Sequence, residues 1–190
     1  MSVKIKKKLF LTVSIVFILI ILLVFALFLL SNSKNTNTNN TEGLSKGIEE
    51  NQIIPTIKAT SFDGKAVNTS DFKGEKSLIL TTMATWCASC IQNSVDLNTA
   101  IKNSGRDDIA VIAITVDPTD NDESLKNFYD KYAGEDWYVL PFDAGTPKVV
   151  EAFKMNNIDL SWVINKDGVI VDTYNWPRSA LQWQNILLSI

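Results

Sequence analysis

Histidine is absent from the 190 residues of this chain, and cysteine occurs only twice. Without an imidazole the chain has no Cys–His or Ser–His nucleophile pair, no histidine ligand for haem and no basis for most copper chemistry. Two cysteines are also too few for a structural zinc site. Such a site normally has four nitrogen or sulfur ligands, so an all-cysteine version would require two chains.

Acidic residues are absent from the first 40 positions. All 21 Asp and Glu residues, but only 13 of the 18 Lys and Arg residues, fall within 41–190, so this part carries a formal net charge of −8. We therefore do not expect nucleic acid as a partner, because phosphate binding requires a basic surface.

The two cysteines lie three positions apart in the segment Trp86-Cys87-Ala88-Ser89-Cys90, directly after the apolar run 78–83. A strand that ends in W-C-x-x-C and opens a helix is typical of a thiol redox site. Residues i and i+3 share one helix face, so the two sulfurs are within reach of each other. The first cysteine lies at the helix start, where unpaired N–H groups and the helix dipole lower a thiol pKa from about 8.5 toward about 3.5–7.5.

We therefore predict that Cys87 is the attacking thiolate and that Cys90 resolves the mixed disulfide. No cofactor is expected for this exchange. Two alternatives stay open. A purely structural disulfide is one, although so short a loop removes little entropy from the unfolded chain. Half of a metal site is the other.

The N-terminal region contains a long apolar run over residues 9–30, preceded by four lysines within residues 1–8. At about 1.5 Å per residue the run spans about 30 Å, the thickness of the hydrocarbon core of a bilayer. We predict a basic cytoplasmic flank over 1–8 and an uncleaved transmembrane anchor over 9–30, with the rest of the chain outside the cytoplasm. A cleaved signal peptide and a buried core helix are the alternatives. The run exceeds the usual length of a signal-peptide core, and Ser31-Asn32-Ser33 is a weak cleavage site.

Residues 31–47 are rich in Asn, Thr and Ser and predict a flexible linker, and residues 48–190 have the size of one domain. A nearly continuous apolar run predicts a buried strand over 109–116, and a second buried strand is expected over 77–83. Extended segments are expected over 53–60, 66–67 and 139–140, and a β-hairpin over 160–172. Helices are expected over 87–102 and 123–132, from Pro147 to Met155, and after Ser179. This order predicts an α/β fold in which helices cover both faces of a mixed sheet.

Several segments, in this order, resemble the TlpA/ResA-like branch of the thioredoxin superfamily over roughly residues 53–189. The redox segment 86–90 is the most specific, and the weaker segments are 61–65, 71–74, 111–117, 142–143, 149–155 and 162–168. The resemblance implies a thioredoxin-like fold with a central mixed sheet, an N-terminal β-hairpin extension and one preceding transmembrane helix. It also implies a membrane-tethered, extracytoplasmic thiol–disulfide oxidoreductase. Such proteins reduce disulfides in exported proteins, apocytochromes included, with electrons from a membrane thiol relay.

The chain departs from this family near the expected site. The cis-proline position of the family falls on Asp159, or on Ile158 if the register slips. Asn93 stands where the family often has Glu, and Thr81 replaces a buried Asp of thioredoxin. Because a cis bond without proline costs about 2.5–4 kcal/mol, we expect a different substrate-docking loop.

Asp159 is accordingly a candidate acid/base. Beside the cysteines, its carboxylate would exchange a proton with Cys90 and raise the thiol pKa by repulsion. The alternative is that Asp159 caps a turn at the surface, a common place for Asp. We expect Trp86 to pack at the active site.

Four functional interpretations remain. The first is a reductase of disulfides in exported proteins, and the second is a thiol oxidase. The third, a non-catalytic redox-sensing or binding module, is favoured by the missing proline and carboxylates. The fourth is a metal binder formed by two chains.

Overall fold

The computed structural model describes residues 20–21, 41, 43–142, 146–155 and 157–190. Residues 41–190 form one compact unit. Within the ranges described, no helix has the length and hydrophobicity needed to cross a bilayer. The predicted anchor over 9–30 lies outside the described residues, except for Ile20 and Ile21.

A five-stranded mixed sheet forms the centre of this unit, with the strand order β5-β4-β3-β6-β7. Strands β3, β4 and β5 are parallel, whereas β6 is antiparallel to both β3 and β7. Their bounds are Ser77–Met83 for β3, Ile109–Thr115 for β4, Trp137–Leu140 for β5, Ser161–Ile164 for β6 and Ile170–Tyr174 for β7. Every residue of β3 and β4 is buried, so both faces of the sheet must be covered.

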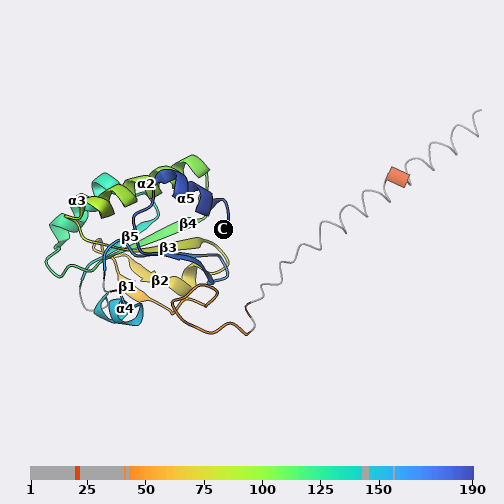
Figure 1. Cartoon of the computed structure of the whole chain (residues 1–190), viewed down its shortest axis with the longest axis horizontal. Coiled ribbons are helices and arrows are strands. Elements are labelled where there is room, and N and C mark those ends of the chain that lie inside the picture. The colour runs from red at the N-terminus through yellow and green to blue at the C-terminus, as the bar shows by residue number, and fades with distance from the viewer. Residues whose placement is uncertain (1–19, 22–40, 42, 143–145, 156) are drawn as a thin grey trace, which may run out of the picture. The chain divides into compact units, whose positions relative to one another are not determined.

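Helices cover the two faces unequally (Figure 1). One face carries α2 (Ala88–Ser104), α3 (Asp122–Tyr132) and α5 (Ala180–Leu187). The other face carries α4 (Thr146–Ala152) and the antiparallel pair β1 (Lys58–Thr60) and β2 (Ala66–Asn68), which leads into the 3-10 turn η1 (Thr69–Phe72). The mixed sheet, the helices on both faces and the N-terminal hairpin are thus confirmed.

Each face has its own hydrophobic core. Leu97, Leu125 and Trp183 come from the three helices of the first face and are at most 1% exposed. On the second face, Val67 and Phe153 pack among the side chains that β3, β4 and β6 present to that side. The sheet that presents the redox segment is therefore buried from both sides.

The predicted helix starts are confirmed by their caps. Asn121 accepts a hydrogen bond from the backbone N–H of Ser124 at the start of α3, and Ser179 does the same for Gln182 in α5. Within α5, Leu181 is 66% exposed whereas Trp183 is fully buried. Successive helix residues are about 100° apart, so the core face that holds Trp183 and Leu187 points Leu181 to solvent.

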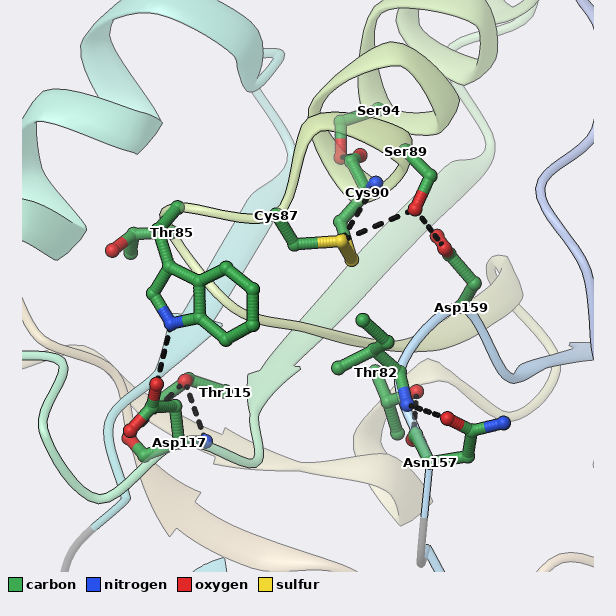
Figure 2. The surroundings of a disulfide bond; sticks show 12 residues. Thr82, Thr85, Cys87, Ser89, Cys90, Ser94, Thr115, Asp117, Asn157 and Asp159 are labelled. Atoms are coloured by element: carbon green, nitrogen blue, oxygen red, sulfur yellow. Dashed lines mark hydrogen bonds between the residues drawn. A yellow bond between two sulfur atoms is a disulfide. The ribbon is translucent and has the colours of Figure 1, made fainter.

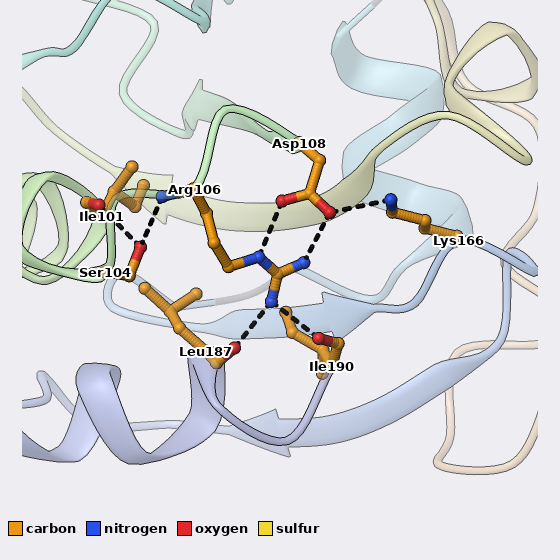
Figure 3. A network of polar contacts seen from close by, with 7 residues as sticks. All are labelled: Ile101, Ser104, Arg106, Asp108, Lys166, Leu187 and Ile190. Carbon is orange, nitrogen blue, oxygen red and sulfur yellow. Dashed lines mark hydrogen bonds and ion pairs between the residues drawn. The ribbon is translucent and has the colours of Figure 1, made fainter.

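A charged network fastens the C-terminus to the start of β4 (Figure 3). Arg106 donates to the backbone carbonyls of Leu187 and Ile190, each at 2.6 Å. It also pairs with the carboxylate of Asp108 at 2.7 Å, and Lys166 reaches the same carboxylate at 2.8 Å. Arg106, and after it Lys166, hold the pKa of Asp108 well below its usual range.

Part of the predicted linker is described. The backbone N–H of Gly47 donates to Ile53 at 3.0 Å, and Ile53 donates to Ser45 at 2.9 Å. Ile53 also forms an isolated antiparallel β-bridge with Val169, the residue before strand β7. The compact unit therefore includes backbone contacts from within residues 45–47.

Candidate active site

The two cysteines form a disulfide at the start of α2, with a Cα–Cα distance of 5.3 Å. Cys87 is the N-cap residue in an extended conformation, and its sulfur accepts a hydrogen bond from the Cys90 backbone N–H at 3.2 Å. Cys87 is 4% exposed and Cys90 is 2% exposed. In the reduced chain the same N–H would face a Cys87 thiolate, which is the arrangement that favours ionised sulfur.

Ser89 connects the cysteines to Asp159 (Figure 2). Its hydroxyl oxygen lies 3.2 Å from the Cys87 sulfur and donates to Asp159 Oδ2 at 2.5 Å. Asp159 is only 6% exposed, and its second carboxylate oxygen, Oδ1, has no hydrogen-bond partner among the described residues. Burial raises the pKa of Asp159, against the opposing effect of the Ser89 hydrogen bond. The surface turn cap considered for Asp159 is therefore wrong.

Strand β3 holds Asp159 at this place through Thr82. The Asp159 backbone N–H donates to the Thr82 carbonyl at 3.1 Å, and the Leu160 N–H donates to the Thr82 hydroxyl at 2.9 Å. The Thr82 hydroxyl in turn donates to the Asn157 carbonyl at 3.0 Å. Asp159 itself has a positive φ of 61°, which is uncommon for a residue with a side chain. The hydrogen bonds to β3 hold this conformation.

Trp86 is 67% exposed beside the disulfide, so it does not fill core space. Its indole N–H donates to the Asp117 carboxylate after strand β4. The backbone N–H of Thr119, and after it the Trp86 indole, lower the pKa of Asp117. The ring is thus tethered at its nitrogen and open to solvent next to the first cysteine.

The two family carboxylate positions that this chain lacks are both buried. Thr81 is 3% exposed within β3. The side-chain oxygen of Asn93 accepts hydrogen bonds from the Arg178 backbone N–H at 3.1 Å and from the Trp183 indole at 2.9 Å. Asn93 therefore joins α2 to α5. Asp159 is the carboxylate that the structure brings to the sulfurs.

The site also contains a set of donors that could hold a metal ion. A sulfur of each cysteine and a carboxylate oxygen of Asp159 lie within 4.8 Å of one another. A count of cysteine and histidine alone misses Asp159 as a third donor. Ser89 was missed as well, because its role depends on a contact with a residue 70 positions away.

Comparison with known proteins gives a family and a fold. The AhpC/TSA family model matches residues 51–173. No curated protein matches the sequence. Similar solved structures include a thiol:disulfide interchange protein of the thioredoxin family from Chlorobium tepidum TLS, with 23% identity, a TM-score of 0.62, and coverage of 72% of this chain and 94% of that one.

Two further structures give the same result. A thioredoxin-like protein from Aeropyrum pernix has 22% identity and a TM-score of 0.58, with coverage of 71% of this chain and 89% of that one. Copper-bound ScoI from Bradyrhizobium japonicum has 23% identity and a TM-score of 0.55, with coverage of 72% and 98%. At these identities the likeness shows a thioredoxin-like fold.

Proposed function

This chain belongs to the AhpC/TSA family, and on that premise we propose that it is an extracytoplasmic thiol–disulfide oxidoreductase that reduces disulfides in exported proteins. One observation carries the proposal. The Cys87 sulfur caps helix α2 and accepts the Cys90 N–H at 3.2 Å, with the Cys90 sulfur in bonding contact. This geometry stabilises an attacking thiolate and places a second thiol where it can release the product.

The reaction consists of two exchanges. The Cys87 thiolate attacks one sulfur of a substrate disulfide, forms a mixed disulfide and releases the other substrate sulfur as a thiolate. Cys90, as a thiolate, then attacks the Cys87 sulfur and releases the second substrate thiolate. Two electrons pass to the substrate, which takes up two protons, and the Cys87–Cys90 disulfide remains. A membrane thiol relay would return the two electrons through the same exchange in reverse.

Asp159 is proposed to accept the Cys90 proton during the second exchange. The support is geometric, since the buried carboxylate lies within 4.8 Å of the sulfurs and is bonded to Ser89. Asp159→Asn should change the pH dependence of disulfide reduction, measured with a chelator present. Asp107→Asn, which alters an exposed carboxylate, is the matched control. An unchanged pH profile in Asp159→Asn would remove the proposed role.

The decisive experiment for the function is capture of the mixed disulfide. Cys90→Ser removes the resolving thiol, so it should accumulate adducts with exported proteins that a reductant releases. Cys87→Ser is the matched control and should give none, because it lacks the attacking sulfur. Equal adducts in both variants, or none in either, would contradict the proposal and favour the non-catalytic module. A resting pair that is mostly oxidised in cells would favour a thiol oxidase.

The extracytoplasmic position is proposed from the sequence. The lysine-rich residues 1–8 followed by the apolar run 9–30 favour an anchor with its C-terminal part outside the cytoplasm. Protease added to intact cells, under conditions in which it reaches the outer face of the cytoplasmic membrane, should digest the domain. Digestion only after that membrane has been permeabilised would refute this orientation.

A further inference from the structure

Opening the Cys87–Cys90 disulfide would leave three ligand atoms facing one another in a buried place. They are the two sulfurs and a carboxylate oxygen of Asp159, all within 4.8 Å of one another, on residues that are 2–6% exposed. Asp159 Oδ2 is bonded to Ser89, whereas Oδ1 has no partner among the described residues. A buried carboxylate oxygen without a partner is costly, so this atom requires an explanation.

We propose that the reduced protein binds one zinc ion through the Cys87 and Cys90 thiolates and the Asp159 carboxylate. Zinc accepts both sulfur and carboxylate oxygen, at about 2.3 Å and about 2.0–2.2 Å respectively. Tetrahedral geometry with these bonds places the ligand atoms about 3.5–3.8 Å apart, a separation that an opened disulfide beside Asp159 can supply. Three protein ligands leave the fourth position for water or an incoming thiolate.

The mixed donor set favours zinc over other common ions. Copper(I) prefers sulfur ligands throughout, whereas magnesium and calcium prefer oxygen alone. Two thiolates with one carboxylate suit a borderline ion that accepts both kinds of ligand. The site needs one chain, unlike the all-cysteine site that would require two.

The disulfide would gate this site, because the oxidised pair has no thiolate to offer. A substrate disulfide that meets the zinc-bound form would take two electrons from the two thiolates and two protons from solvent. The products would be two substrate thiols, the Cys87–Cys90 disulfide and free zinc. Zinc would therefore occupy the reduced protein until a disulfide oxidises the two thiolates and so releases the ion. Binding needs the dithiol but not turnover, so it stands apart from the proposed reductase function.

The test is a zinc titration of the purified full chain, reduced with a phosphine and handled without oxygen. We expect one zinc per reduced chain and none per oxidised chain. Cobalt(II) in place of zinc should give thiolate charge-transfer absorption. Loss of a direct ligand should exceed the ~10–100-fold cost of outer contacts, so we expect Asp159→Asn to weaken zinc binding at least ~100-fold.

Two further variants keep the result interpretable. Ser89→Ala removes the hydrogen bond to Asp159 but keeps the carboxylate, so it should still bind zinc. Asp107→Asn should bind zinc as the unmodified chain does. Thermal unfolding followed by circular dichroism shows whether Asp159→Asn remains folded.

Three results would overturn the proposal. They are equal zinc binding by the reduced and oxidised chains, unchanged affinity in a folded Asp159→Asn, and one zinc per two chains. The capture experiment with Cys90→Ser reports on the reductase separately, so failure of one idea is distinguishable from failure of the other.

Discussion

Replacing Asn93 with alanine tests how the start of helix α2 is held against helix α5. The side-chain oxygen of Asn93 accepts from the Arg178 backbone N–H at 3.1 Å and from the Trp183 indole at 2.9 Å, and both bonds are buried. Truncation leaves two buried donors without a partner, and each costs about 1–3 kcal/mol. We therefore expect Asn93→Ala to lower the free energy of unfolding by at least ~2 kcal/mol.

The assay is urea unfolding of the oxidised chain followed by Trp fluorescence and circular dichroism. Asn103→Ala is the control, because it makes the same change at an exposed position of the same helix. It should alter the free energy of unfolding by no more than ~0.5 kcal/mol. A loss below ~1 kcal/mol in Asn93→Ala would contradict this expectation, since it would mean that the two donors find other partners.

Three further predictions concern other parts of the domain. Arg106 lowers the pKa of Asp108, so this carboxylate stabilises the fold above its ordinary pKa and loses that effect as the pH falls through its folded value. Asp108→Asn should therefore lower the free energy of unfolding by about 1–2 kcal/mol at pH 7. Urea unfolding should show that the difference between the variant and the unmodified chain shrinks in acid, and a difference that stays constant with pH would contradict this. Leu187→Ala should lower the free energy of unfolding by about 2–4 kcal/mol in the same assay, whereas Leu181→Ala, on the exposed face of α5, should lower it little. Equal losses would contradict this assignment of the buried and exposed faces of α5. Trp86→Ala should leave the unfolding midpoint nearly unchanged and reduce mixed-disulfide capture in a Cys90→Ser background, because Trp86 is exposed and directly precedes Cys87 in the chain. Undiminished capture would exclude a contact with substrate.

Much of the fold could be predicted from local patterns. Strand 109–115 is almost continuously apolar and strand 77–83 is largely so, because both faces of the sheet are covered, and this pattern is visible without knowing the partners. Helix starts were predicted equally well, since a cap acts within three residues. The buried face of the last helix is harder to predict, because an apolar residue in a short helix, such as the exposed Leu181, does not by itself reveal which face is buried.

The site was predictable only in part. The positions of Cys87 and Cys90 follow from spacing within one helical turn. Asp159 became a candidate only because it falls on the cis-proline position of the family that the chain resembles. Its contact with Ser89 joins residues that are 70 positions apart in the sequence. The partners of Asn93 come from helix α5, near the other end of the domain. Contacts of this kind depend on the packed sheet and helices, so no local pattern in the sequence contains them.

The proposed chemistry requires that the start of helix α2 keep the Cys87 sulfur ionised near neutral pH. The most direct measurement is the alkylation rate of the reduced Cys90→Ser chain against pH, with a chelator present to keep metal from the sulfur. We expect a midpoint well below the value of about 8.5 for an ordinary thiol. A midpoint at or above about 8.5, or a sulfur that does not react at any pH in the folded chain, would contradict it.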